Sequence, residues 1–404
     1  MSSNRRNLVI LFTTMVVMMI GFGLVIPILP FYIEWLGASG RDLGLLIGAY
    51  SLMQLICAPF WGGLSDRIGR KPVLLFGVLG NALSMLFMGL STTLWMLFTA
   101  RILAGILSSA TFPTAMAYIS DSTSEENRGG GMGGIAAAMG VGMVLGPGLG
   151  GWLGGMNLSI PFFVAAGLSI LVLMLIFLIL PESLPPERRS QATGKMRGPD
   201  FRPMWQSLFG SLGYLMVLSF LLSFGLTNFE AIFGLYALER FGYGPEQVGT
   251  VFAVIGITSV LVQGLLTGPL TRRWGEGRVI QGALLMSAIG FLVLLTAFNF
   301  ATVLLTICFF MVGNTLLRPT TAALISKRSG QQEQGTFLGL HNSFMSLGRI
   351  AGPTWAGFVF DFNMSLPYIS GAVIMALSLL TSFVWLTQKQ QRQTVPYDVE
   401  LPLT

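Results

Sequence analysis

Long apolar stretches separated by short polar loops dominate the chain. A helix needs about 20 mostly apolar residues to cross a bilayer, and the sequence predicts twelve such helices. They cover residues 8–33, 43–64, 72–91, 94–120, 130–154, 160–180, 208–238, 247–271, 279–298, 300–326, 335–360 and 366–387. The apolar residues form continuous runs instead of alternating segments, which favours helices over a transmembrane β-barrel. The first stretch is too long for a signal-peptide core, so we expect it to be retained.

Composition agrees with a membrane protein. Charged residues make up 10% of the 404 positions and apolar residues 53%, whereas a soluble domain carries roughly 25% charged residues. This excludes a soluble enzyme, a nucleic-acid binder and a disulfide-built secreted domain. Cys57 and Cys308 lie inside apolar stretches, and with His341 as the only histidine they give no zinc-ligand spacing. We expect neither a metal nor a cofactor.

The basic residues predict the orientation. Arg41 and Arg240 are the basic residues in one set of loops, whereas eighteen of the 23 lie in the other set. These eighteen are Arg5, Arg6, Arg67, Arg70, Lys71, Arg128, Arg188, Arg189, Lys195, Arg197, Arg202, Arg272, Arg273, Arg278, Lys327, Arg328, Lys389 and Arg392. By the positive-inside rule, both termini are cytoplasmic, and we expect a multi-pass protein of a bacterial cytoplasmic membrane. The net charge of +6 thus reports topology and not nucleic-acid binding.

The chain divides into two halves that resemble each other. A polar segment rich in proline and basic residues, 182–207, separates residues 1–181 from 208–388, and we expect the tail 389–404 to be disordered. A shift of 206 positions superimposes many glycines and prolines of the halves, among them Gly69 on Gly275. Parallel repeats of six helices are typical of transporters in which two bundles rock around a site between them.

Four motifs identify a family. They are residues 62–72 (GGLSDRIGRKP), 142–151 (GMVLGPGLGG), 101–105 (RILAG) and 21–30 (GFGLVIPILP). The first resembles the signature loop of the major facilitator superfamily, the second its antiporter motif, and the other two resemble motifs of spans four and one. Residues 223–230, 317–319 and 334–335 further resemble the NorA, Bmr and Blt group of multidrug efflux pumps.

This resemblance implies an all-α major facilitator fold, with twelve transmembrane helices in two pseudo-symmetric six-helix bundles. It also implies export of small amphipathic, often cationic drugs in exchange for protons, by a monomer in the lipid bilayer. Two positions depart from the pattern. Thr315 takes the place of a second acid in span ten, and Arg272 stands where the acid of the signature loop would repeat. Glu230 is therefore the acid left within the spans for coupling.

The charged residues within the spans are candidates for proton coupling. Glu230 in span seven either exchanges a proton for substrate or is a protonated structural acid, because an intramembrane carboxylate is costly unless it is neutral, paired or hydrated. Arg101 either helps to set the proton affinity of the site or is a structural arginine. Arg318 is a candidate for substrate binding or structural pairing, and Arg349 has no assigned role.

A second group of candidates would control the conformational change. The resemblance implies that Arg70 pairs with Asp121 and that Asp66 caps the eleventh span; solvated loop charges are the alternative. Arg67 and Gly69 belong to the same loop. The glycine-proline motif adds small residues for close helix contact and a kink. Its members are Gly142, Gly146, Pro147, Gly150 and Gly151.

Polar and aromatic residues within the spans are candidates for substrate contact. They either line an adaptable pocket or pack between helices. They are Gln54, Phe112, Phe229, Phe233, Tyr236, Gln263, Asn314, His341, Asn342 and Phe344. The sequence has no Walker loop for ATP. We therefore expect a proton-driven exporter and not an enzyme, with a major facilitator carrier for one metabolite, sugar or peptide as the alternative.

Overall fold

The protein is described by a computed structural model that covers residues 3–123, 125–189, 202–330 and 333–392. All regular elements of this part are helical. They are α1 (Ser3–Trp35), α2 (Gly40–Ile68), α3 (Arg70–Gly89), α4 (Leu94–Ser108), α5 (Thr111–Ser122), α6 (Glu125–Met156), α7 (Ile160–Ile179), η1 (Pro186–Arg188), α8 (Arg202–Leu208), α9 (Gly213–Phe241), α10 (Pro245–Leu261), η2 (Val262–Leu266), α11 (Thr267–Leu294), α12 (Phe300–Arg328), α13 (Gln334–Phe360) and α14 (Leu366–Arg392). The linker residues Lys195 and Arg197 and most of the predicted tail lie outside the described residues.

These helices supply the twelve predicted spans. Ten stretches of the described chain are long and apolar enough to cross a membrane. One of them, Pro245–Leu294, holds two spans, because the helix is interrupted at Gly275. The helix α13, with its polar residues and Arg349, supplies the twelfth. The predicted span 94–120 is broken into α4 and α5 at Ser109 and Ala110, which the sequence pattern did not indicate.

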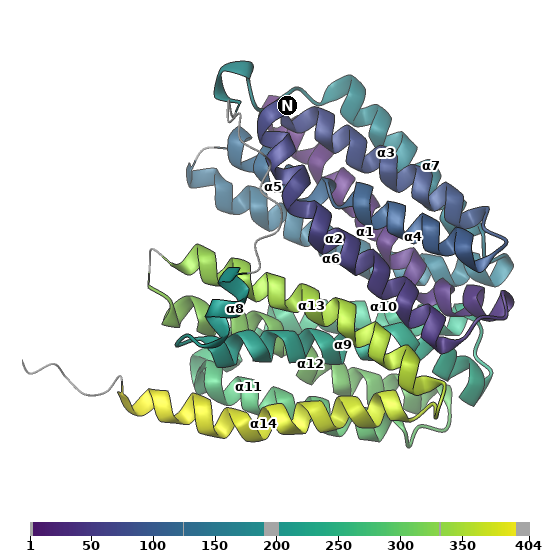
Figure 1. Cartoon of the computed structure of the whole chain (residues 1–404), viewed down its shortest axis with the longest axis vertical. Helices are drawn as coiled ribbons and strands as arrows, with labels where there is room; N and C mark the ends of the chain where they lie inside the picture. The colour runs from purple at the N-terminus through teal and green to yellow at the C-terminus, as the bar shows by residue number, and fades with distance from the viewer. Residues whose placement is uncertain (1–2, 124, 190–201, 331–332, 393–404) are drawn as a thin grey trace, which may run out of the picture.

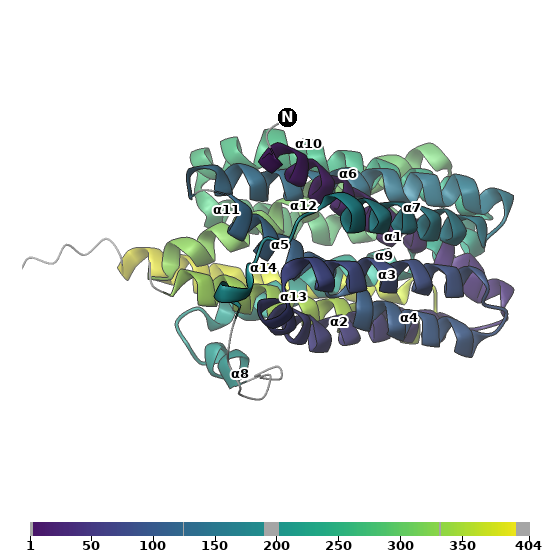
Figure 2. The same ribbon diagram turned by 90° about the horizontal axis from the view of Figure 1, so that it is seen from above.

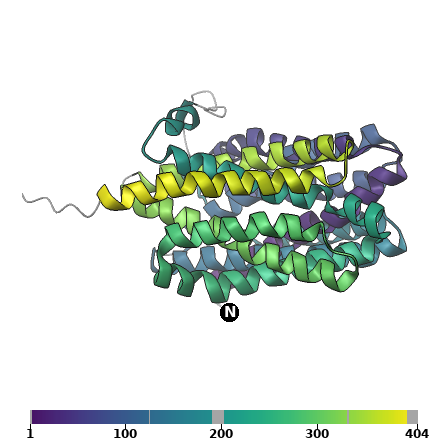
Figure 3. The ribbon, with the colours of Figure 1, turned by 90° about the horizontal axis from the view of Figure 1, so that it is seen from below.

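The spans form two bundles, α1–α7 and α9–α14 (Figure 1). In the first bundle, α3 packs against α4 and α7, as Figure 2 shows from above. In the second bundle, α14 packs against α9 and α11 on the face seen in Figure 3. We call the end of the molecule that carries residues 62–72 the signature face, and the other end the opposite face.

The repeat appears in the backbone as well as in the sequence. Gly69 between α2 and α3 has φ +107°, and Gly275, which lies 206 positions later, has φ +77°. Both values lie in the region that glycine adopts without steric cost. The same tight turn therefore joins the second and third spans of each bundle, which confirms the pseudo-symmetric arrangement.

Glycines bring the two bundles together at the opposite face. A side chain at Gly151 on α6 would lie 2.6 Å from the Cα atom of Gly249 on α10, and one at Gly357 on α13 would lie 3.1 Å from the Cα atom of Gly44 on α2. Asp361, which follows α13, accepts hydrogen bonds from the backbone N–H groups of Gly40 (2.9 Å) and Arg41 (3.1 Å). The bundles are therefore closed against each other at this face.

The same helices lose this contact toward the signature face. A side chain at Gly133 or Gly140 of α6, or at Gly335 or Gly339 of α13, would meet no described atom within 4 Å. Figure 1 shows the two bundles diverging toward this end. The molecule is therefore open at the signature face and closed at the opposite face.

The glycine-proline motif also holds the first bundle together. Gly142 and Gly146 of α6 closely approach the α1 backbone. A side chain at Gly142 would lie 2.8 Å from Val16 O, and one at Gly146 would lie 2.8 Å from the Cα atom of Gly23. Gly150 approaches Leu24 of α1 in the same way, and Pro147 lies inside the helix beside Gly23. Small residues thus allow the close helix packing that association within a membrane requires.

Candidate functional site

Residues of both bundles meet at one depth in the membrane. Tyr50 on α2, Glu230 on α9 and Arg349 on α13 each lie ten or eleven residues from the end of their helix at the opposite face. At a rise of 1.5 Å per residue this is about 15 Å, half of a hydrocarbon core of about 30 Å. Arg101 lies seven residues into α4, which begins at the same face. We call these four residues the central cluster.

Glu230 faces Arg349 across the second bundle. The carboxylate is half-buried, and the two charges act on each other without forming a direct ion pair among the described residues. Arg349 is exposed in the middle of α13, and its Nη2 atom donates to Ser346 Oγ at 2.8 Å. Because a charged side chain facing lipid is costly, this exposure indicates a hydrated space between the bundles.

Tyr50 connects the charges of the two bundles. The Cζ atom of Arg101 lies 5.2 Å from the centre of the Tyr50 ring, within the range of a cation–π interaction. Tyr50 also lies near Arg349 of the other bundle, on the helix that packs against α2. Arg101 itself is 5% exposed. Sequence reasoning missed Tyr50, because one tyrosine in an apolar helix carries no signal of its position.

Arg70 organises the signature face of the first bundle. Its Nε atom donates to Asp121 Oδ2 at 2.9 Å, and its Nη1 atom donates to Asp66 Oδ1 at 2.5 Å and to Ser65 Oγ at 2.7 Å. The expected Arg70–Asp121 pair is thus present. Arg67 is half-buried on the last turn of α2. The guanidinium of Arg70 ties α3 to both α2 and α5.

Asp66 does not cap the eleventh span as expected. The first turn of α13 has no side-chain cap, and Asp66 is engaged by Arg70 within its own bundle, with 53% of its side chain exposed. The reason is geometric, since the two bundles are apart at the signature face. The expectation is therefore wrong for this conformation.

Glu182 supplies a cap that sequence reasoning missed. Its carboxylate follows α7 and accepts hydrogen bonds from the backbone N–H groups of Arg70 (2.8 Å) and Lys71 (3.1 Å) at the start of α3. A side chain at Gly69 would collide with this carboxylate. An acid at a helix N-terminus satisfies unpaired N–H groups and the helix dipole. Glu182 therefore attaches the end of the first bundle to the signature loop.

The second bundle has a counterpart of the Arg70–Asp121 pair. Glu276 forms an ion pair with Lys327, and these positions lie 206 residues after Arg70 and Asp121. The signs of the two charges are exchanged. The constant offset between the halves was the sequence signal that could have identified this pair.

Comparison with known proteins identifies the family. The model of the Major Facilitator Superfamily matches residues 11–264 and 215–401. The chain belongs to the major facilitator superfamily. Multidrug resistance protein 2 of Bacillus subtilis (strain 168) is 34% identical over 94% of this chain and 95% of that protein. Tetracycline resistance protein, class C, of Escherichia coli is 33% identical over 94% and 96%.

More distant relatives agree with this assignment. Quinolone resistance protein NorA of Staphylococcus aureus is 27% identical, over 96% of this chain and 97% of that protein. The crystal structure of the nucleoside transporter NupG has a TM-score of 0.72 at 16% identity, covering 96% and 99%. That of the human organic anion transporter MFSD10 has a TM-score of 0.66 at 24% identity, covering 94% and 99%. The protein is thus a major facilitator transporter and not an enzyme, and it is related to drug efflux proteins.

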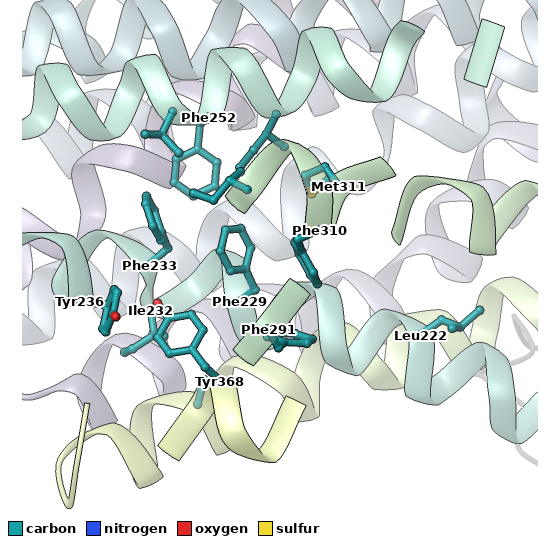
Figure 4. Packing of buried hydrophobic residues seen from close by; sticks show 14 of the residues in the cluster. Leu222, Phe229, Ile232, Phe233, Tyr236, Phe252, Phe291, Phe310, Met311 and Tyr368 are labelled. Atoms are coloured by element: carbon teal, nitrogen blue, oxygen red, sulfur yellow. The ribbon is translucent and has the colours of Figure 1, made fainter. Parts of the chain in front are cut away.

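The predicted aromatic substrate residues occupy different environments in this major facilitator protein. Phe229, Phe233 and Tyr236 of α9 are completely buried and pack in one aromatic cluster with residues of α10, α11, α12 and α14 (Figure 4). Phe344 is also buried in this core. Phe112 is 44% exposed and borders the space around Arg101. In this conformation Phe112 is the one of these five that is open to a substrate.

The predicted polar residues also separate into two groups. Gln263, Arg318 and Asn342 are exposed in the middle of their helices, and Gln54 is half-buried with Nε2 3.5 Å from Tyr50 OH. His341 is buried, and its Nδ1 atom lies 2.7 Å from Ser219 Oγ, which places it in a packing contact. Asn314 is buried as well. Its neighbour Thr315 lies within hydrogen-bond distance of Ser259, with 3.2 Å between the two hydroxyl oxygens.

Proposed function

We propose that this transporter exports amphipathic drugs or toxic compounds in exchange for protons by alternating access. Its relatives bear the names of multidrug, tetracycline and quinolone resistance proteins. The observation that carries the proposal is Glu230, an acid at mid-membrane depth that is half-buried beside a hydrated space and faces Arg349. Such an acid can release a proton to water and accept one again, which is the property that proton coupling requires.

The orientation and movement follow from the charges and the contacts. The excess of basic residues supports a cytoplasmic position for the signature face and both termini. The described conformation is then inward-facing. We propose that residues 1–181 and 208–388 move as units, opening the glycine contacts at the opposite face and closing the signature face. The residues 182–207 connect the two units.

In this cycle Glu230 binds a proton while the site faces outward and releases it inward, and substrate takes the opposite route. One charge moved across 100 mV supplies about 2.3 kcal/mol. That is enough for a substrate gradient of roughly fortyfold, at about 1.4 kcal/mol for each factor of ten. Arg101 and Arg349 set the electrostatic environment in which this proton is exchanged.

Transport in reconstituted liposomes tests the proposal. The purified protein is reconstituted, a pH gradient is imposed, and the movement of fluorescent dyes and quinolones is recorded. We expect transport that depends on the gradient in the wild type and its loss in Glu230→Gln. Glu239→Gln is the matched control, because Glu239 is an exposed acid on the same helix. Gradient-driven transport that persists in Glu230→Gln would contradict the coupling role, and transport of no amphiphile would favour a dedicated metabolite carrier.

A further inference from the structure

A small cavity inside the first bundle contains Arg101. It has a volume of about 50 Å³, room for a few water molecules or one small polar group. It is lined by twelve described residues, none of them acidic, and Tyr50 and Phe112 are among them. Because Tyr50 also belongs to the central cluster, this cavity is an extension of the candidate substrate site.

Arg101 lacks an anionic partner among the described residues that line this cavity. The side chain is almost completely buried, its contact is the face of the Tyr50 ring, and its Nε atom has no hydrogen-bond partner in the described part of the chain. The hydroxyl of Thr111, which lines the same cavity, is also buried without a described partner. A buried charge is strongly unfavourable unless it is paired and hydrogen-bonded. The cavity therefore offers donors and a positive charge to a ligand that supplies acceptors and a negative charge.

The chemistry of this ligand follows from the guanidinium. Its planar fork of donors matches the two oxygens of a carboxylate. A cavity of this size holds a carboxylate but not a whole drug, so it receives one end of a larger molecule. We infer that the Arg101 cavity is a subsite for a carboxylate of the substrate.

The rest of the central cluster defines the class of substrate, on the basis of the proposed proton exchange. A positive group beside Glu230 would favour release of its proton, as exchange requires. A purely cationic amphiphile would meet Arg101, Arg318 and Arg349 with no negative charge of its own. A molecule that carries both an amine and a carboxylate on an apolar body can place its amine beside Glu230 and its carboxylate in the Arg101 cavity. The preferred substrates are therefore zwitterionic amphiphiles.

Two fluorescent probes test the carboxylate directly. Nα-dansyl-lysine is a zwitterionic amphiphile, and monodansylcadaverine is the same molecule without the carboxylate. Binding to the purified protein in nanodiscs is measured by dansyl fluorescence at neutral pH. We expect the wild type to bind dansyl-lysine about tenfold more tightly, since a hydrogen-bonded charge pair contributes that much. Equal or weaker binding of dansyl-lysine would overturn the inference.

Variants locate the preference in the cavity. Arg101→Gln should reduce the tenfold ratio to about one, and Arg101→Lys should retain part of it because the charge remains. Arg41→Gln removes the same charge at the opposite face, outside the candidate site, and should retain the preference. A preference that survives Arg101→Gln, or that is lost in Arg41→Gln, would contradict the assignment. Wild-type binding is decisive even where a variant folds poorly.

A salt titration distinguishes a substrate carboxylate from a free anion as the ligand of the cavity. A transport assay then separates binding of the probe from its transport. Sodium chloride is titrated into the binding assay, and abolition of the preference at physiological concentration would assign the cavity to a free inorganic anion instead. Transport of dansyl-lysine is then measured under a pH gradient. If the probe binds with the expected preference but the gradient drives transport of neither this probe nor any other amphiphile, the proposed function fails and the carboxylate subsite stands.

Discussion

Lys327 forms an ion pair with Glu276 at the positions that correspond, by the 206-residue repeat, to Asp121 and Arg70. The first bundle therefore carries its cation on the third span, and the second bundle carries its anion there. In both bundles the pair joins the segment directly after a glycine of positive φ to another helix. The sign of each charge differs between the halves, whereas the pairing is kept. We conclude that the contact between the segments matters more at this place than the order of the charges.

The second-bundle pair can be inverted to match the first. Lys327→Asp places two acids opposite each other and should lower stability by about 1 kcal/mol or less, because the lysine is largely exposed and such pairs are weak. Adding Glu276→Arg recreates the order of charges in the first bundle and should restore the stability. Thermal unfolding, followed by tryptophan fluorescence, measures both effects. A double variant no more stable than Lys327→Asp would show that the pairing is not what is required.

The Glu182 cap predicts a local effect on the signature loop. Glu182→Ala removes the acceptor for the N–H groups of Arg70 and Lys71 and should cost about 1 kcal/mol, as loss of a helix cap does. Hydrogen–deuterium exchange should accelerate in the first turn of α3. Glu187→Ala, in the exposed turn η1, is the control and should leave this exchange unchanged. Equal exchange in the two variants would exclude the capping role.

The sequence predicts the fold of this protein well because lipid simplifies the problem. Each span must be apolar over a fixed length, so hydropathy locates the helices. The repeat then predicts equivalent turns, and Gly69 and Gly275 indeed share a positive φ. Hydropathy does not indicate two local features. They are the break between α4 and α5 and the π-helical turn η2, for which the apolar pattern has no signal. The break lies four residues before Pro113, which has no N–H to donate to the carbonyl of Ser109 and whose ring clashes with it.

The candidate site is less predictable, because it depends on which way each side chain faces. Phe229 and Phe112 look equivalent in the sequence, yet one is buried in the core and the other is exposed beside Arg101. Glu182 and the start of α3 are more than a hundred residues apart and meet only through the fold. The motif around Asp66 predicts a contact with the other bundle that is absent among the described residues, because a sequence motif does not specify which conformation of the cycle is populated.

Because Phe229 is buried and Phe112 is exposed, substitution of Phe229 should affect stability, whereas substitution of Phe112 should affect substrate affinity. Phe229→Ala should destabilise the protein by about 3–5 kcal/mol, because it opens a cavity in the aromatic cluster. Phe112→Ala should leave stability within about 0.5 kcal/mol and change the relative affinities for different amphiphiles. Thermal unfolding and dye binding, measured on both variants, separate the two effects. A Phe112→Ala variant as unstable as Phe229→Ala would contradict the positions described.

The contact between Gly151 and Gly249 predicts how the opposite face can be held open. Gly151→Val would place a branched side chain against the backbone of α10, where even a Cβ atom lies 2.6 Å from Gly249 Cα. The two bundles then cannot close at this face, and transport should fall more than tenfold. Double electron–electron resonance between spin labels at the exposed positions Arg41 and Phe362, in a Cys57→Ser, Cys308→Ser background, should report a longer distance. Gly167→Val on α7 is the matched control, since no described atom lies within 4 Å of a side chain there. If Gly151→Val leaves both the label distance and transport unchanged, closure of the opposite face does not depend on this glycine contact.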